Sequence, residues 1–419
     1  MQEISDIKSA FRDVNKWWTK DFSIEFKSRE IYGEIKKFID KRQIIALTGL
    51  RRVGKTTIMF KIIEENLKIL NKENVVYFSF DYFNDVKIRE VIEAYCDIFG
   101  KNIESEKYIF FFDEIQKLEN WEEQIKRYYD NYPNIKFIIS GSESLFIRKK
   151  SRESLAGRFY EFSIKPLSFK EFISFKNIKI GENLELYERD ILNLFRQYII
   201  TNGFPELINE DIETCKKYLK ESIIEKIIYK DIPEIFDIKD IDLLDKIVRI
   251  IMLNPGQIIE ISKLSSELSV SRQTLSLYLR YLEDSFLIRK LYNFSRNIRK
   301  TEKKSKKFYC SIIHPDLIDS EKISKAFENF IVIQLEAEFF YIDTSKNEVD
   351  IIKMDKGIIK PIEIKYGKID IDGLKKFMKK FNIKIGYIIS YNKKQEINFE
   401  DKTIKVIPFY FVLLNKTTI

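Results

Sequence analysis

Residues 44–57 read IIALTGLRRVGKTT, an apolar run that gives way to a glycine-containing turn and then to a helical pattern. Gly49 and Gly54 stand at the first and sixth positions of the turn, where glycine lets the backbone point successive N–H groups inward. Such donors at a helix N-terminus bind phosphate oxygens. Lys55 would then face the β- and γ-phosphates, and the Thr56 hydroxyl would be a ligand of Mg²⁺. We predict a phosphate-binding loop for ATP and Mg²⁺; a plain strand-to-helix turn is the alternative.

The predicted nucleotide site takes residues from this loop, from two strand ends and from one later turn. Its members are Gly49, Arg51, Arg52, Val53, Gly54, Lys55, Thr56, Thr57, Asp113, Ser140 and Pro205.

Composition excludes several other classes of protein. At 419 residues the chain is longer than one hydrophobic core usually serves, so several domains are expected. We find no run of eighteen apolar residues and no signal-peptide pattern, which predicts a cytoplasmic protein without a membrane partner. Three widely spaced cysteines and a single histidine, His314, argue against disulfides, zinc sites and Ser-His-Asp catalysis. Chemistry is therefore expected from carboxylates, Lys, Arg and bound Mg²⁺.

The net charge of +8 is carried by the C-terminal part. Residues 296–419 hold 25 Lys and Arg against 17 Asp and Glu. This excess suits contact with nucleic acid, while an ordinary lysine-rich surface is the alternative.

Apolar, β-rich runs recur between helical patterns at 75–80, 108–112, 136–139 and 159–164, which predicts an α/β fold with a parallel sheet. The run 108–112 leads directly into Asp113 and Glu114. Ligands of open α/β sheets bind at the carboxyl ends of strands. We predict that Asp113 holds Mg²⁺ and that Glu114 polarises the attacking water. An acidic helix cap is the alternative.

Two further groups complete the predicted catalytic machinery. Ser140 ends the strand at 136–139 and could sense the γ-phosphate. Arg158 ends the polar segment 151–158 and is predicted to act as an arginine finger, either on its own ATP or on that of a neighbouring subunit in a homo-oligomer. Arg148 and Arg152 compete for this role. The predicted catalytic residues are Lys55, Glu114 and Arg158.

Four strings resemble the prokaryotic AAA-type ATPases that carry a C-terminal nuclease-like domain: GLRRVGKTT, FFFDEIQKLENWEEQIKRYYD, FIISGSESLF and SLAGRFYEFSIKPLSFKEF. The resemblance implies a P-loop core of the AAA+/STAND kind. It favours Arg158 as the arginine finger, because the family arginine lies in the segment that matches 155–158. Gln116 and Trp121 also match family positions. Arg29 lies in an element resembling the Gly-Arg-Glu found ahead of STAND phosphate loops, with Ser28 in place of the glycine.

The pattern divides the chain into five parts. They are a leader (1–25), a P-loop ATPase core (26–166), a helical lid (167–250), a winged helix-turn-helix (251–307) and an α/β nuclease-like domain (308–419). In the lid, Gly203-x-Pro205 resembles the Gly-x-Pro element with which STAND lids touch base and ribose. A plain helix-breaking turn is the alternative.

The winged helix predicts DNA as a partner, with packing between domains as the alternative. Ser271 is the expected N-cap of the second helix of the motif. The residues expected in the major groove are Arg272, Gln273, Thr274 and Ser276. Those expected to meet phosphates are Arg296, Arg299, Lys300, Lys303, Lys304, Lys306 and Lys307.

The last domain has the spacing of a PD-(D/E)XK nuclease, with Asp350 followed after twelve residues by Glu363-Ile364-Lys365. A hairpin turn at 355–357 would let Glu363 and Lys365 share one face with Asp350. Asp350 and Glu363 would form a second Mg²⁺ site, with Lys365 activating water and Glu328 as a further ligand. A half-solvated hairpin is the alternative.

The leading hypothesis is a Mg²⁺-dependent ATPase whose nucleotide state rearranges the lid and the C-terminal region. The alternative is a nucleotide-gated scaffold or DNA-binding regulator that hydrolyses ATP slowly and has no nuclease activity.

Overall fold

The computed structural model describes residues 2–83, 86–141, 155–297, 301, 304–314, 317, 322–414 and 419. The chain divides into two compact units, Met1–Pro166 and Leu167–Ile419. Each unit has its own sheet.

The first unit is built on a five-stranded sheet of order β2-β3-β4-β1-β5. All its pairings are parallel. The strands are β1 (Ile44–Thr48), β2 (Val75–Ser79), β3 (Tyr108–Asp113), β4 (Ile135–Ser140) and β5 (Phe159–Ser163). Because β1 and β3 are buried along their whole length, they read as continuous apolar runs rather than alternating ones.

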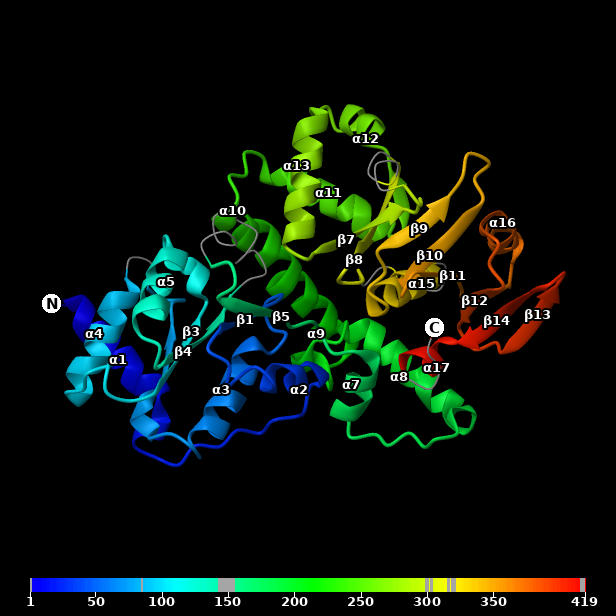
Figure 1. Ribbon diagram of the computed structural model, residues 1–419. Helices are drawn as coiled ribbons and strands as arrows, with labels where there is room; N and C mark the ends of the chain where they lie inside the picture. Colours follow the sequence, from blue (N-terminus) through cyan, green and yellow to red (C-terminus); the bar gives the residue numbers. More distant parts are fainter. Residues whose placement is uncertain are drawn as a thin grey trace. The chain divides into compact units, whose positions relative to one another are not determined.

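Helices cover both sides of this sheet, with α3 and α5 on opposite sides (Figure 1). They are α1 (Gln2–Val14), α2 (Glu30–Lys36), α3 (Lys55–Asn66), α4 (Ile88–Phe99) and α5 (Trp121–Asn131), with short 3₁₀ turns at Lys16–Trp18, Lys72–Asn74 and Ile115–Lys117. The predicted leader is an integral part of the unit, since Trp17 is buried and its Nε1 donates to the Val75 carbonyl at 2.8 Å.

The predicted α/β class with a parallel sheet is confirmed. Each strand expected in the first unit is present, with ends that differ by one residue at most. For β1 and β3 the expectation succeeds because burial on both faces leaves a run of β-branched and aromatic residues that no helical pattern matches.

The second unit begins with helices and ends in a sheet covered by helices. Its N-terminal helices are α7 (Phe169–Phe175), α8 (Glu188–Thr201) and α9 (Ile212–Lys217), with 3₁₀ turns at Leu184–Tyr187 and Pro205–Leu207. After α9 the chain continues in π-helical turns, Tyr218–Ile224 and Ile227–Asp231, into α10 (Ile232–Ile235). The later helices are α11 (Ile241–Leu253), α12 (Ile261–Glu267), α13 (Arg272–Asp284), α15 (Ile323–Gln334), α16 (Asp372–Phe381) and α17 (Phe409–Leu413).

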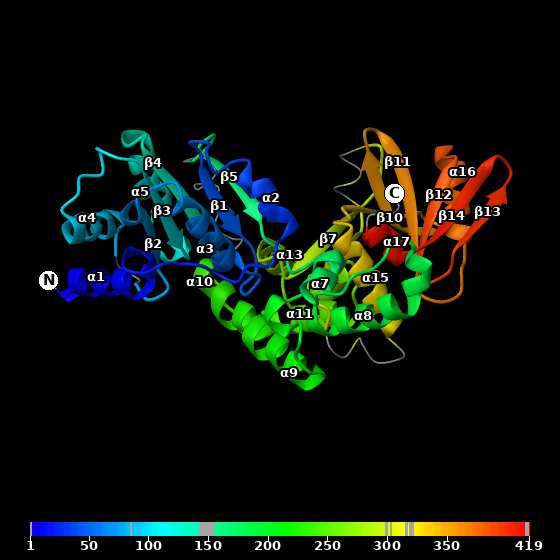
Figure 2. The same cartoon turned by 90° about the horizontal axis from the view of Figure 1, so that it is seen from below.

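The sheet of the second unit has nine strands in the order β13-β14-β12-β11-β10-β9-β7-β8-β6. Their bounds are β6 (Gln257–Ile259), β7 (Ile288–Asn293), β8 (Lys306–Cys310), β9 (Phe339–Ile342), β10 (Glu348–Asp355), β11 (Ile358–Lys365), β12 (Ile385–Ser390), β13 (Gln395–Phe399) and β14 (Lys402–Pro408). One core joins the sheet to α7, α8 and α15, which lie beside one another in Figure 2, and a second joins it to α16.

Two pairings join parts that the sequence divides. Strand β8 spans the expected boundary at residues 307 and 308, and it pairs with β6 and β7. Strand β7 in turn pairs in parallel with β9 through Tyr292 and Asn293. The segments 251–307 and 308–419 therefore share one continuous sheet.

Candidate functional site

The phosphate-loop sequence forms a tight turn between β1 and α3. Gly49 has φ 146°, and a Cβ there would lie 2.2 Å from the Ile164 carbonyl oxygen, so only glycine fits. Gly54 has φ 97° and precedes Lys55, the first residue of α3. The Lys55 Nζ donates to the carbonyls of Gly49 and Leu50 at 2.9 and 3.0 Å. The lysine cation thus lies inside the curve of the turn.

The Asp113 carboxylate, at the carboxyl end of β3, collects donors from three other elements. Its Oδ2 accepts from the Thr56 hydroxyl and from the Tyr77 hydroxyl, each at 2.7 Å. Its Oδ1 accepts from the Ser140 hydroxyl, and from the Glu114 N–H at 3.2 Å. Because the strands are parallel, β1, β2, β3 and β4 deliver these groups to the same edge of the sheet.

Glu114 lies next to this cluster in a left-handed backbone conformation, φ 53°, which is uncommon for a residue other than glycine. Its carboxylate accepts a hydrogen bond from the Gln116 Nε2. Burial raises the pKa of Glu114 above its ordinary value, while the Lys55 ammonium and the Gln116 amide act in the opposite direction. A carboxyl group so placed can hold or release a proton near the phosphate loop.

Two residues of this site were not assigned chemistry by sequence reasoning. Tyr77 is buried in β2, where an aromatic residue looks like ordinary core. Gln116 matched the family only as a position, and its Oε1 is a buried oxygen with no hydrogen-bond partner among the described residues. For Gln116, the only signal in the local sequence is that it follows Glu114 by two residues.

Arg29 connects the phosphate loop to the segment after β5 through hydrogen bonds of its guanidinium. Its Nη1 donates to the Val53 carbonyl at 3.0 Å, and its Nη2 donates to the Lys165 carbonyl at 2.7 Å. The buried guanidinium therefore ties the loop to the segment after β5. Of the other predicted loop residues, Val53 is buried, Arg51 is half-buried, and Arg52 and Thr57 are exposed.

Arg158 lies at the other end of the strands, directly before β5, where β1 and β5 begin. Its carbonyl accepts from the N–H of Ile44, the first residue of β1, at 2.8 Å. Its guanidinium binds Asp130 in the last turn of α5 through Nε and Nη2, at 2.9 and 3.2 Å. The span of β1, about 13 Å at 3.3 Å per residue, separates it from the start of the phosphate loop. Arg158 therefore does not reach the loop of its own chain, and its competitors Arg148 and Arg152 lie outside the described residues.

Comparison with known proteins agrees with this geometry. The profile of the family described as an AAA domain matches residues 41–173, and that of a domain of unknown function matches residues 192–311. The uncharacterised protein MJ1544 of Methanocaldococcus jannaschii is 30% identical over 425 residues, covering 93% of this chain and 92% of that protein. The chain belongs to the family of MJ1544 and carries an AAA domain.

Two other similarities are more distant. An uncharacterised protein of Haemophilus influenzae is 27% identical to this AAA protein, over 78% of this chain and 83% of its own length. A solved structure of a Thermotoga maritima RuvB variant has a TM-score of 0.32 and 17% identity, covering 66% of this chain and 91% of that one. So low a score adds nothing to the assignment. In the described part of the AAA protein, no helix is long and apolar enough to cross a membrane.

Beyond the AAA domain, Pro205 belongs to the second unit, where it opens a 3₁₀ turn after α8. Gly203 before it has φ 70°, and its carbonyl accepts from the Leu167 N–H at 2.8 Å. These contacts account for the Gly-x-Pro element as a local turn. Its contact with a nucleotide stays a prediction.

The segment 241–310 contains α11, β6, α12, α13, β7 and β8 in that order, with β6 and β7 both antiparallel to β8. Ser271 caps α13, because its hydroxyl accepts from the Thr274 N–H at 3.0 Å. Arg272, Gln273 and Ser276 are exposed on α13. Of the predicted phosphate contacts, Arg299, Lys300 and Lys303 lie outside the described residues.

The predicted second metal site is a buried cluster of charged groups around β10 and β11. The Ile364 N–H donates to the Asp350 Oδ2 at 2.8 Å, and the Lys365 Nζ donates to the Glu363 Oε2 at 2.9 Å. Burial, then the nearby Asp350 carboxylate, raises the pKa of Glu363 well above its ordinary value. The geometry thus brings Asp350, Glu363 and Lys365 together.

Lys307 corrects one prediction. Instead of facing nucleic-acid phosphates, it is 3% exposed and forms ion pairs with Glu328, Glu348 and Asp350. Burial and the Asp350 carboxylate raise the pKa of Glu328 to about 7. Within the described ranges, no three His, Cys, Asp or Glu side chains are grouped so that they could hold a metal ion. The Lys307 ammonium, paired with three of these carboxylates, stands where Mg²⁺ would need an oxygen-only ligand set, so the cluster as arranged does not fit that ion.

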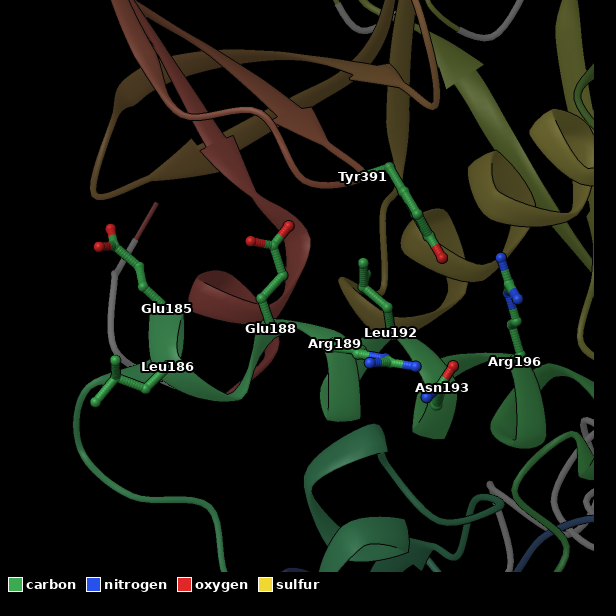
Figure 3. A pocket seen from close by; sticks show the side chains of 8 residues that line it. All are labelled: Glu185, Leu186, Glu188, Arg189, Leu192, Asn193, Arg196 and Tyr391. Atoms are coloured by element: carbon green, nitrogen blue, oxygen red, sulfur yellow. The ribbon is translucent and has the colours of Figure 1, made fainter.

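An open groove of about 520 Å³ lies elsewhere in the second unit, along α8. Figure 3 shows Tyr391, which follows β12, pointing towards the row of side chains on that helix. The lining residues are Glu185, Leu186, Glu188, Arg189, Leu192, Asn193, Arg196 and Tyr391. None of them was predicted as a site residue. Because its two acids and two arginines balance, the groove favours no charged ligand class.

Proposed function

We propose that this AAA protein binds ATP with Mg²⁺ and hydrolyses the terminal phosphate. The observation that carries the proposal is the Asp113 cluster, in which Thr56 and Ser140 share one buried carboxylate at the edge of the sheet that holds the Lys55 loop. Phosphoryl transfer needs positioned charge more than covalent participation, and this edge supplies it.

The Thr56 hydroxyl and the Asp113 carboxylate fit Mg²⁺, because both are hard oxygen ligands already within 2.7 Å of each other. The ion would neutralise charge on the phosphate oxygens. Lys55 would add a cation at the β- and γ-phosphates, and the backbone N–H groups of the loop would orient them. Glu114, which accepts a hydrogen bond from the Gln116 amide, would also accept one from the attacking water and so orient that water.

The test compares a variant that should lose ATP binding with one that should lose only ATP hydrolysis. Lys55→Ala should abolish binding of a fluorescent ATP analogue, whereas Glu114→Gln should keep binding and lose phosphate release. Lys61→Ala is the control, since Lys61 lies on the same helix but pairs with Glu64. Full turnover in Glu114→Gln would remove Glu114 as the base. Full binding in Lys55→Ala would contradict the nucleotide site itself.

We infer that Arg158 acts on the ATP of a neighbouring subunit, because it lies at the edge of the sheet remote from its own loop. Arg158→Ala should lower turnover by up to about a thousandfold with little loss of binding. Mixing Arg158→Ala with Glu114→Gln protein should restore turnover, because a mixed pair joins an intact loop to an intact arginine. No recovery in the mixture would contradict action between subunits.

A second proposal concerns the segment 241–310, which we propose is a winged helix that binds duplex DNA. Its support is the capped helix α13, whose first turn presents Arg272 and Gln273 to solvent. Arg272→Ala should weaken duplex binding and, because it removes one cation from the DNA interface, lower the salt dependence of affinity by about one unit of slope. Arg249→Ala, on α11 and paired with Asp245, is the control. If the salt dependence of DNA affinity in Arg272→Ala equals that of wild type, Arg272 does not contact the DNA.

The effect of DNA on ATP turnover distinguishes the two leading hypotheses. Strong stimulation by duplex DNA favours a nucleic-acid-directed ATPase. Slow turnover that DNA leaves unchanged favours a nucleotide-gated scaffold, and the Glu114→Gln variant provides the background rate.

A further inference from the structure

Lys307 lies at the centre of the acidic cluster in the second unit, although it comes from β8 and the acids come from α15 and β10. Its Nζ is 3.7 Å from the Glu328 Oε1 and 3.9 Å from the Asp350 Oδ1, and it forms a direct ion pair with Glu348. The Tyr309 hydroxyl, which donates to the Glu328 Oε1 at 2.7 Å, closes the cluster.

Burial sets this lysine apart from the others in a lysine-rich chain. Across the described part of the chain, three lysines are buried: Lys55, Lys307 and Lys402. Lys55 belongs to the phosphate loop, and Lys402 pairs with the exposed Asp401. Removing an ammonium from water is costly unless it is paired and hydrogen-bonded. Three carboxylates around Lys307 meet that requirement.

We propose that Lys307 is an internal cation that takes the place of a divalent metal in this cluster and keeps it metal-free. A divalent ion would draw carboxylate oxygens in to about 2.0–2.1 Å for Mg²⁺. Here two of the oxygens stand 3.7 and 3.9 Å from the ammonium nitrogen. A second ammonium serves the other carboxylate of the predicted pair, since the Lys365 Nζ donates to the Glu363 Oε2 at 2.9 Å. The charge that a metal would neutralise is neutralised by the protein itself.

The position of Lys307 also gives the cation a structural task. Strand β8 pairs with β6 and β7, whereas Asp350 lies on β10 and Glu328 on α15. The ammonium therefore ties the segment 241–310 to the two acidic elements. Metal-assisted hydrolysis of a phosphodiester needs a bound divalent ion, and here the Lys307 ammonium takes that ion's place. The intact chain should therefore not cleave nucleic acid at this cluster. This inference does not depend on the proposed ATPase activity.

The first test uses the otherwise unaltered chain. Mn²⁺ is titrated into nucleotide-free wild type and into Asp350→Asn, and bound ions are counted from the electron paramagnetic resonance signal of free Mn²⁺. The same number of ions per chain is expected, because wild type binds none at Asp350. Asparagine can still accept from the Ile364 N–H, which preserves the local hydrogen bond. One ion fewer in Asp350→Asn would overturn the proposal.

The second test removes the internal cation. Lys307→Met keeps most of the side-chain volume and should bind one additional Mn²⁺ per chain, which Lys307→Met with Asp350→Asn should lose again. Lys290→Met is the matched control, since Lys290 lies on β7 and pairs with Glu283 outside the cluster. A circular dichroism spectrum like that of wild type establishes folding. A folded Lys307→Met protein without the additional ion would overturn the proposal, and if this variant does not fold, the wild-type titration decides.

Discussion

At the residue scale, Asp113 shows how one carboxylate organises the candidate nucleotide site. It is buried, yet it accepts from three hydroxyls and one backbone N–H, so both of its oxygens are satisfied. Hydrogen bonds to an ionised acceptor are stronger than those between neutral groups. Thr56, Tyr77 and Ser140 are therefore fixed relative to one another through this single residue.

Tyr77→Phe should lower the free energy of unfolding by about 1.5–3 kcal/mol, the usual contribution of a hydrogen bond to a charged group. The change removes the hydroxyl that donates to Asp113 at 2.7 Å and retains the ring contact with Phe60. Urea denaturation followed by circular dichroism measures the difference. Tyr82→Phe is the control, because Tyr82 is 89% exposed and should be neutral. Equal effects in the two variants would contradict the role of the Tyr77 hydroxyl.

The pKa of Glu114 predicts how turnover depends on pH. Burial raises this pKa, and a base works only when deprotonated, so turnover should be lost on acidification at a pH above the ordinary glutamate value of 4.5. The Gln116 amide lowers the pKa of Glu114, and Gln116→Leu removes that donor. The acidic limb of kcat/KM should therefore move to higher pH in Gln116→Leu.

Gln124→Leu is the control for this shift, since the Gln124 side chain accepts from the Ile88 N–H away from the site. Its acidic limb should coincide with that of wild type. A limb that stays in place in Gln116→Leu would show that Gln116 does not act through the Glu114 carboxyl.

At the scale of elements, the phosphate loop depends on a close approach of two backbones. Gly49→Ala would place a Cβ 2.2 Å from the Ile164 carbonyl oxygen, and the positive φ adds strain. We expect loss of ATP-analogue binding together with a lower melting temperature. Gly33→Ala in α2 is the opposite case, because a Cβ there meets nothing within 4 Å. Alanine in a helix should stabilise by about 0.5–1 kcal/mol.

Both changes are measured by thermal unfolding and by binding of the fluorescent analogue. If the Gly49→Ala protein binds the analogue as wild type does, the turn after β1 tolerates a side chain, contrary to this geometry.

The elements could be predicted where the signal is local. The strands of the first unit follow from continuous apolar runs, and the loop follows from glycine spacing. The burial of Lys307 among carboxylates could not be predicted. Its partners lie 21 to 43 residues further along the chain, and the local sequence pattern does not show that their elements pack against β8. The placement of Arg158 needs the sheet order, since only the parallel pairing of β5 with β1 assigns it to the edge away from the loop.

At the scale of the whole molecule, the division at Pro166 and Leu167 means that two compact units contribute to stability. Every predicted nucleotide-site residue except Pro205 belongs to the first unit. A ligand that binds only the folded state stabilises the unit that holds its site, and the amount follows from its concentration relative to Kd.

Calorimetry of Glu114→Gln, which should bind without turnover, tests this division. With ATP and Mg²⁺ at a hundred times Kd, the stabilisation is about 2.7 kcal/mol. For a unit of this size that corresponds to a rise of roughly 5–10 °C in one unfolding transition, at about 2–4 °C for each kcal/mol. The transition of Leu167–Ile419 should move little, and Lys55→Ala should abolish the shift. If both transitions move together, the nucleotide contacts both units, and the predicted contact of Pro205 with base and ribose gains support over the interpretation of Gly203-x-Pro205 as a local turn.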